Sequence, residues 1–301
     1  MKIGLIDVDS HNFPNLALMK LSAYHKAQGD DVEWWNGFVH YDRVYQSKVF
    51  DETYTEDMDF CIMADEVIKG GTGYDLNNKL PYEIEHMCPD YSLYGIEDTA
   101  YGFLTRGCPR ACPFCIVASK EGRKIQKVAD LDEFDRGQKN IELLDPNLLA
   151  CKEHEELLNQ VIESKAWVNF NQGLDARCLT KDNVELINKV KVKGIHFAWD
   201  FLGNESQIRG GLELFRKSAK RKMSGHGYAT VYVLTNFNTT HEEDLYRVNV
   251  LRSMEMEPYI MIYNKGTEPK ITRHLQRYVN NRFIFYATTW EEYMKTRSVI
   301  E

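Results

Sequence analysis

The sequence predicts an α/β fold in which a small Rossmann-like β/α domain precedes six further strand–helix units. Three observations support this prediction. Short apolar runs alternate with longer amphipathic stretches from residue 100 onward, each predicted strand there ends in polar residues, and the first 76 residues alternate in the same way on a smaller scale. Strands that alternate with helices of this length form parallel sheets with right-handed crossovers. Six units are too few to close an eight-stranded TIM barrel.

The N-terminal domain, residues 1–76, opens with the apolar segment Lys2–Asp7, which is typical of a buried parallel strand. A helix is predicted to begin at Pro14 and to end at Gly29, where glycine tolerates the backbone of a helix end. The segment Val32–Trp35 is the next strand candidate, and the apolar run Phe60–Ala64 followed by Val67–Tyr74 completes the unit. The pattern therefore predicts a short, Rossmann-like sheet.

Two loops follow strands of this predicted sheet, at the edge where open parallel sheets bind ligands. One holds Asp9 and His11, and the other holds Gly70, Gly71 and Gly73. We expect the glycines to form a tight turn that needs positive φ. A phosphate-binding loop is disfavoured, because no helix start follows them.

Residues 77–98 are a polar connector with two prolines, and residues 99–268 hold the six strand–helix units. The predicted strands are Ala100–Thr105, Asn140–Leu144, Trp167–Asn171, Ile195–Asp200, Tyr228–Thr235 and Pro258–Tyr263. The predicted helices are Leu131–Gly137, Lys152–Ser164, Lys181–Val190, Ser206–Lys220, Thr240–Met254 and Pro269–Val279. Residues 269–301 are expected to form a C-terminal cap over the carboxyl ends of the strands.

Three cysteines in the spacing C-x-x-x-C-x-x-C, Cys108, Cys112 and Cys115, directly follow the first of these strands. Iron–sulfur clusters normally take four thiolates, so this trio leaves one iron open to a small ligand. Zinc is the main alternative, but zinc sites usually show a second Cys or His pair. The remaining cysteines stand singly, at Cys61, Cys88, Cys151 and Cys178. A third alternative is that the three cysteines are merely buried.

The motif, with Phe114 just before its last cysteine, resembles the hallmark of the radical S-adenosylmethionine (SAM) superfamily. The resemblance extends over about two thirds of the chain and implies a partial (β/α)6 TIM-type barrel. It also implies a four-iron four-sulfur (4Fe-4S) cluster on Cys108, Cys112 and Cys115, with SAM on the open iron and Phe114 beside the adenine. In that family an electron from the cluster cleaves SAM to a 5′-deoxyadenosyl radical, which abstracts hydrogen from a substrate. An electron donor such as flavodoxin or ferredoxin is therefore implied as a partner.

Parallel barrels place their active sites at the carboxyl ends of the strands. The polar residues there that we predict to contact the cofactor are Asp145, Asn147, Gln172, Arg177, Asp200 and Asn236. The resemblance implies that the SAM amine lies near the end of the second strand, where Asp145 is the carboxylate. We assign Asp200 to the ribose hydroxyls and Arg177 to the SAM carboxylate. Helix capping explains single members of this set, but not Gln172 or Arg177.

The segment Asp9-Ser10-His11 resembles the start of the D-x-H-x-x-G motif of cobalamin-binding domains, in which the His binds cobalt. Here the final Gly is replaced by Pro14, and the domain is short. Two enzymatic hypotheses therefore stand: hydrogen abstraction by the deoxyadenosyl radical, and cobalamin-dependent methyl transfer. A third, non-enzymatic hypothesis is a structural or redox-sensing cluster.

Composition limits the partners and the compartment. The chain has 301 residues and a net charge of −8, which argues against a general nucleic-acid surface. No apolar stretch approaches the ~20 residues of a membrane span. Seven cysteines without disulfide-scaffold spacing fit a reducing interior, so the cytoplasm is the predicted location. The amide and aromatic residues at the strand ends favour a neutral substrate of modest size.

Overall fold

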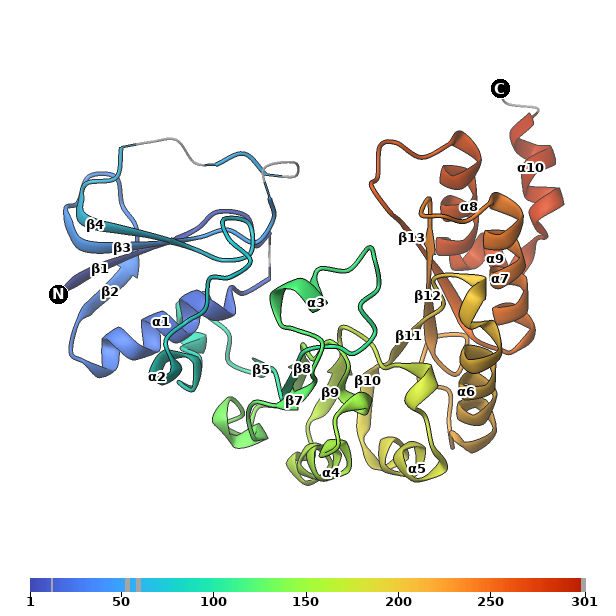
Figure 1. Cartoon of the computed structure of the whole chain (residues 1–301), viewed down its shortest axis with the longest axis horizontal. Coiled ribbons are helices and arrows are strands. Elements are labelled where there is room, and N and C mark those ends of the chain that lie inside the picture. Colours follow the sequence, from blue (N-terminus) through green and yellow to red (C-terminus); the bar gives the residue numbers. More distant parts are fainter. Residues whose placement is uncertain (12, 52–54, 58–60, 299–301) are drawn as a thin grey trace.

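The computed structural model describes residues 1–298 except residues 12, 52–54 and 58–60. Figure 1 shows two α/β units that follow one another along the chain, with the N-terminal sheet on one side and the larger unit on the other. None of the helices in the described part of the chain combines the length and the hydrophobicity of a membrane span.

The N-terminal unit is a four-stranded parallel sheet in the order β2-β1-β3-β4. Its strands are β1 (Lys2–Asp7), β2 (Asp31–Trp34), β3 (Tyr41–Ser47) and β4 (Ala64–Gly70). Helix α1 (Leu16–Ala27) begins after Asn15, whose side chain accepts a hydrogen bond from the Leu18 backbone amide. Ile3 and Leu5 of β1 are buried together with Leu18. The predicted Rossmann-like sheet is confirmed.

Two details of this sheet differ from the prediction. The sequence analysis missed β3, because Tyr41–Ser47 mixes charged and amide residues with only two buried apolar ones. The predicted strand Phe60–Ala64 is wrong where it is described: residues 61–63 lie outside the sheet, and β4 begins at Ala64. Phe60 lies outside the described residues.

The connector 77–98 contains α2 (Tyr82–Glu85) and the 3-10 turn η1 (Tyr91–Tyr94), and it fastens the two units together. The Tyr91 hydroxyl donates to the Phe134 carbonyl (2.8 Å) and accepts from the Tyr101 amide (3.0 Å). On the other side, the Asp90 carboxylate accepts from Lys26 of α1 (2.6 Å). The predicted domain boundaries at residues 76, 98 and 268 stay predictions.

The larger unit is a series of parallel strands whose spatial order follows the chain. The strands are β5 (Thr99–Gly102), β8 (Asn140–Leu143), β9 (Trp167–Phe170), β10 (Lys191–Gly194), β11 (His196–Ala198), β12 (Thr230–Thr235) and β13 (Glu257–Ile262). Only Ile195 separates β10 from β11, so residues 191–198 act as one bent strand that pairs first with β9 and then with β12. The six predicted strands and the open, partial barrel are confirmed.

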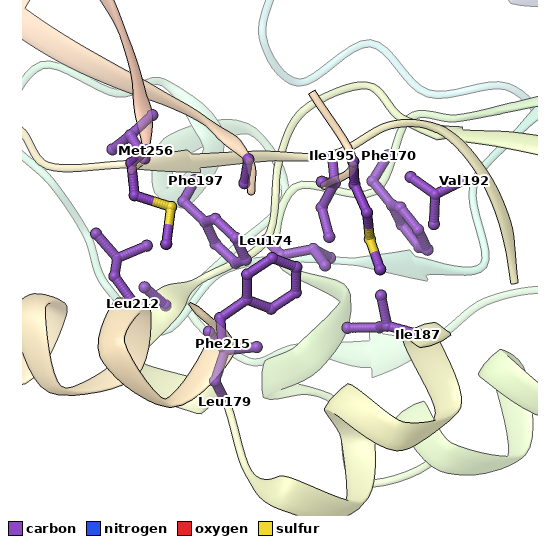
Figure 2. Close-up of a cluster of buried hydrophobic side chains, with 14 of the residues drawn as sticks. Phe170, Leu174, Leu179, Ile187, Val192, Ile195, Phe197, Leu212, Phe215 and Met256 are labelled. Atoms are coloured by element: carbon purple, nitrogen blue, oxygen red, sulfur yellow. The ribbon is translucent and has the colours of Figure 1, made fainter. Parts of the chain in front are cut away.

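Helices pack along one face of these strands (Figure 1). They are α4 (His154–Ser164), α5 (Lys181–Lys189), α6 (Glu205–Ser218), α7 (His241–Ser253) and α8 (Lys270–Asn280). Figure 2 shows the core between sheet and helices, in which Phe197 of β11 meets Phe215 of α6 with ring centroids 5.1 Å apart. Burial of this apolar face is the main favourable contribution to folding.

The predicted helix Leu131–Gly137 is wrong. The segment forms only the 3-10 turn η2 (Leu131–Glu133), closed by a capping box between Asp130 and Glu133. Phe134 then packs on Gly102, where an added Cβ would lie 2.4 Å from the Phe134 ring. This contact draws the chain onto the sheet before a helix can continue.

We expected the C-terminal segment to cover the carboxyl ends of the strands, but it does not. Arg282 of α9 (Arg282–Ala287) pairs with Glu257, the first residue of β13, and Tyr286 contacts His226, which precedes β12. Both contacts lie at the amino ends of the strands. The segment is held there by aromatic contacts between Tyr278 of α8 and α10 (Trp290–Ser298).

Candidate functional site

The loop that carries the three cysteines lies between the short antiparallel strands β6 (Thr105–Arg106) and β7 (Gln126–Lys127). Gly107 opens it with φ +88°, and a Cβ there would lie 2.3 Å from the Lys124 carbonyl oxygen. The Cys108 amide donates to the Gly122 carbonyl (3.2 Å). Between the cysteines, Ala111 has φ +48°. Such values are rare for residues with a Cβ, so the loop follows a tightly specified course.

The three thiols differ in exposure: Cys108 and Cys112 are half-buried and Cys115 is exposed. Burial raises the pKa of the Cys112 thiol, and the negative charges of Asp200 and Cys115 raise it further. Thiolates bind metal, so a cationic centre at this loop would relieve the charge that gathers there. Within the described residues, no three Cys, His, Asp or Glu side chains meet at the position of one metal ion. Cys108, Cys112 and Cys115 are three free thiols on one loop, and a 4Fe-4S cluster binds each thiolate through a different iron, so this donor set fits a cluster.

Asp175, which follows β9 and is 6% exposed, ties the cysteine loop to the neighbouring loop. Its carboxylate accepts from Arg110, inside the cysteine motif (Nε to Oδ2, 2.6 Å), and from Arg177 (Nε to Oδ1, 2.7 Å). Asn147 Nδ2 donates to the same Oδ2 (3.3 Å). These donors, led by Arg177 and Arg110, outweigh burial and keep the pKa of Asp175 below its ordinary value.

Two buried side chains with acceptor oxygens, Asp145 and Asn147, follow β8, and Asn147 lies beside Cys108. Asp145 Oδ1 accepts from the Thr105 backbone amide (2.5 Å) and hydroxyl (2.7 Å), while Asp145 Oδ2 has no hydrogen-bond partner in the described structure. Asn147 Nδ2 donates to Cys108 Sγ (3.5 Å), and its Oδ1 is also buried without a partner. Unpaired buried acceptors are costly, so this pair suits a ligand that brings N–H donors. The predicted position of the SAM amine therefore fits these residues.

Asp200 follows β11 and faces the cysteine loop. Burial raises its pKa to about 6, although the positive charges of Arg247 and Arg177 oppose that effect. Arg247 of α7 is fully buried and donates to the carbonyl oxygens of Trp199 (2.5 Å) and Leu234 (2.8 Å). It thereby fixes the ends of β11 and β12 next to each other.

An aromatic series joins the cysteine loop to the last two strand ends. The Phe114 ring lies 5.5 Å from Phe237, and Phe237 lies 4.8 Å from Tyr263, both edge to face. Asn236 donates to the Tyr263 carbonyl (2.9 Å), so its amide points toward the β13 end. Gln172 is exposed. The structure thus brings Phe114 and Asn236 to one side of the strand ends.

The Asp9–His11 loop of the N-terminal unit is arranged differently. Asp9 is 2% exposed, and its two carboxylate oxygens accept from the backbone amides of Val49 (2.7 Å) and Phe50 (2.8 Å). His11 is exposed and its ring contacts Phe50 at 6.4 Å. A metal-binding His usually donates its second ring N–H to a carboxylate or carbonyl. Asp9 is already occupied, so the motif residues do not form the pair that a cobalt-ligating His11 would need.

The glycine turn after β4 behaves as expected. Gly71 has φ +97°, and a Cβ at Gly73 would lie 2.1 Å from the Phe50 carbonyl oxygen. These glycines allow the turn to pack against the loop after β3. They leave no open cradle for a phosphate.

The sequence places Asp175 among the polar residues at the strand ends, but it assigned neither Asp175 nor Arg110 a role in binding the cofactor. Asp175 is the N-cap of the 3-10 turn η4 (Ala176–Cys178). In the sequence it therefore cannot be told apart from an ordinary capping residue. The available signal was the Arg inside the cysteine motif, because a guanidinium matches the geometry of a carboxylate.

No family model and no curated protein matches this sequence. Solved structures do match its fold. The chain is similar to the radical S-adenosylmethionine methyltransferase TsrM from Kitasatospora setae with cobalamin and a [4Fe-4S] cluster bound, with a TM-score of 0.63 and 11% identity over 87% of this chain and 74% of TsrM. A second TsrM structure, with tryptophan substrate and the SAM analogue aza-SAM bound, gives a TM-score of 0.64 and 11% identity over 86% and 72% of the two chains. At this identity the match establishes the fold, and it extends over both α/β units.

Proposed function

We propose that this chain is a radical SAM enzyme in which Cys108, Cys112 and Cys115 hold a 4Fe-4S cluster and SAM binds the open iron. The observation that carries the proposal is the C-x-x-x-C-x-x-C loop, held at the carboxyl ends of a partial parallel barrel by Asp175 and Arg110. Once bound, the cluster supplies the electron that cleaves SAM. The shared fold with TsrM supports the same assignment.

The chain's own residues divide the work of binding SAM. Asp145 Oδ2 and Asn147 Oδ1 accept from the SAM amine, because both are buried acceptors without a hydrogen-bond partner among the described residues, and Asn147 contacts Cys108. Asp200 accepts from the ribose hydroxyls. Arg177 attracts the SAM carboxylate while it stays paired with Asp175. Phe114, Gln172 and Asn236 are assigned to the adenine side.

Of the two reaction outcomes, methyl transfer is favoured by the comparisons, because TsrM is a methyltransferase with cobalamin bound and the similarity includes the N-terminal unit. The residues do not support His11 as a cobalt ligand, since Asp9 binds the Val49 and Phe50 amides instead. A corrin would therefore have to bind without an Asp9–His11 pair at its cobalt. Hydrogen abstraction is the second candidate.

One incubation separates the hypotheses. Anaerobically reconstituted protein is mixed with SAM and dithionite, with and without hydroxocobalamin, and the products are separated by liquid chromatography. S-adenosylhomocysteine together with retained cobalamin supports methyl transfer. 5′-Deoxyadenosine without retained cobalamin supports hydrogen abstraction. If reconstituted protein with about four irons per chain yields neither product, the cluster is structural or redox-sensing and the enzymatic proposal is wrong.

A further inference from the structure

One face of the larger sheet is left uncovered by the described part of this chain. Along each strand, one set of residues packs against the helices, whereas the alternate set points away from them. Parallel sheets normally bury both faces. Here, however, Trp167, Tyr259, Met261 and Tyr263 are 46%, 41%, 45% and 38% exposed. An exposed aromatic face of this kind indicates a binding surface.

A row of five side chains crosses this face, and we call it the inner row. Its members are Glu142, Asn169, His196, Tyr232 and Tyr259, from β8, β9, β11, β12 and β13. The strand register pairs Glu142 with Asn169 and Tyr232 with Tyr259. Parallel pairing therefore brings together residues that lie up to 117 positions apart in the sequence.

The first half of the inner row is acidic. Asn169 Nδ2 donates to Glu142 Oε2 (2.5 Å), and Lys193 Nζ lies 3.3 Å from Glu142 Oε1. The Glu142 side chain is 13% exposed and the Lys193 side chain is 52% exposed. An exposed lysine contributes about 0–1 kcal/mol to such a pair. A ligand ammonium can therefore replace Lys193 at Glu142 at little cost.

The second half is aromatic. The His196 and Tyr232 rings are stacked, with centroids 5.1 Å apart and planes 13° apart. The Tyr259 ring stands edge-on to Tyr232 at 5.9 Å. Burial lowers the pKa of His196, so at neutral pH this half presents an uncharged ring surface. Flat rings pack on such surfaces with a gain beyond their buried area.

We propose that the inner row binds the substrate of this enzyme and that the substrate is an aromatic amine, with its ring on Tyr232 and Tyr259 and its ammonium on Glu142. The proposal rests on the proposed function for its place in turnover. Glu142 precedes Asp145 by three residues, and a strand rises about 3.3 Å per residue. The inner row thus lies on the order of 10 Å from the residues assigned to SAM, within the reach of one small molecule.

Binding of three probes that share a phenylethyl group tests the proposal: phenethylamine, 2-phenylethanol and 3-phenylpropionate. Their binding to the full chain is followed by saturation-transfer NMR and calorimetry. Phenethylamine should bind most tightly. Glu142→Gln should weaken phenethylamine at least about tenfold and leave 2-phenylethanol unchanged, because only the amine uses the carboxylate. Tyr232→Ala should weaken all bound probes, and Tyr232→Phe should restore them. Glu155→Gln, on the exposed surface of α4, is the matched control and should change nothing.

Equal binding of the three probes, or phenethylamine binding that Glu142→Gln does not change, would overturn the proposal. Thermal melting followed by circular dichroism shows whether each variant is folded, and the Tyr232→Phe protein keeps the ring if Tyr232→Ala fails to fold. The binding measurements need no cluster. Amine-selective binding in a protein that does not cleave SAM would support the inner row and contradict only the proposed radical chemistry.

Discussion

The cysteine loop and the Asp9–His11 loop occupy equivalent places, each after the first strand of a parallel sheet, yet they are built differently. Asp175 binds side chains of the cysteine loop and its neighbour, Arg110 and Arg177, and so fixes functional groups. Among the described residues, Asp9 accepts from backbone amides of the loop after β3, whereas His11 contacts the Phe50 ring. A sequence motif can act as a functional site where a buried carboxylate, such as that of Asp175, orients the motif's side chains. Where the anchor holds backbone alone, the same residues are structural.

The largest expected effect is loss of the cluster on removal of a cysteine ligand. Cys112→Ala should lose nearly all iron and the visible absorption of reconstituted protein, because three thiolates are already the minimum for an open-iron cluster. Cys61→Ala, in the N-terminal unit, is the control and should keep both. Equal iron in the two variants would mean that the cysteine loop is not the binding site. Iron is measured by colorimetric assay.

The two anchors should differ when each is removed. Asp175→Ala leaves Arg110 and Arg177 without their carboxylate, which should cost on the order of 3 kcal/mol of unfolding free energy and lower iron retention. Asp9→Ala leaves the backbone amides of Val49 and Phe50 without their acceptor oxygens. This change should cost about 2 kcal/mol of unfolding free energy and leave the iron content unchanged. Urea unfolding and iron analysis measure both quantities. A loss of iron in Asp9→Ala would erase the distinction between the two loops.

The pH dependence of stability tests the buried carboxylates of the cysteine side. Burial raises the pKa of Asp145 from 3.8 to about 6, so the folded state binds its proton more tightly than the unfolded state. Its contribution to stability is therefore full below the unfolded value and is lost as pH rises through about 6, by roughly 2–3 kcal/mol. Asp145→Asn should therefore reduce the fall of unfolding free energy with rising pH. The part of this fall that remains should come from Asp200, which has a similar pKa. If urea unfolding at pH 4–7 shows the same pH dependence of unfolding free energy in Asp145→Asn as in the unchanged protein, Asp145 is not its source.

The smallest effect is expected at His11. His11→Ala should leave iron content, SAM cleavage and the absorption spectrum of any bound cobalamin unchanged, because His11 is exposed and Asp9 does not orient it. The spectrum is diagnostic, since a cobalt-bound imidazole shifts it. A spectral change in the variant would show that the Asp9–His11 loop becomes a ligand site after all.

The strand pattern of the larger unit was predictable because apolar runs alternate there with amphipathic helices from β8 onward. The failures share one cause. Tyr41–Ser47 and Leu131–Gly137 lack a clear period, so tertiary contacts decide their conformation: β3 is a strand because β1 and β4 pair with it, and Phe134 packs on Gly102. The C-terminal segment was misplaced because its aromatic partners, such as Tyr278 and Trp290, were known only by position in the sequence.

The sequence by itself predicted the three cysteines as cluster ligands, and it determined the parallel α/β order and the strand ends where polar residues gather, because spacing and period are local properties of the chain. Only the tertiary structure decided which polar residues act together. Arg110 and Asp175 are 65 residues apart in the sequence, so no single helix or strand could bring them together. Their pairing depends on how β5, β8 and β9 align. The inner row depends in the same way on register, because a shift by one residue would turn Glu142 and Tyr232 toward the helices.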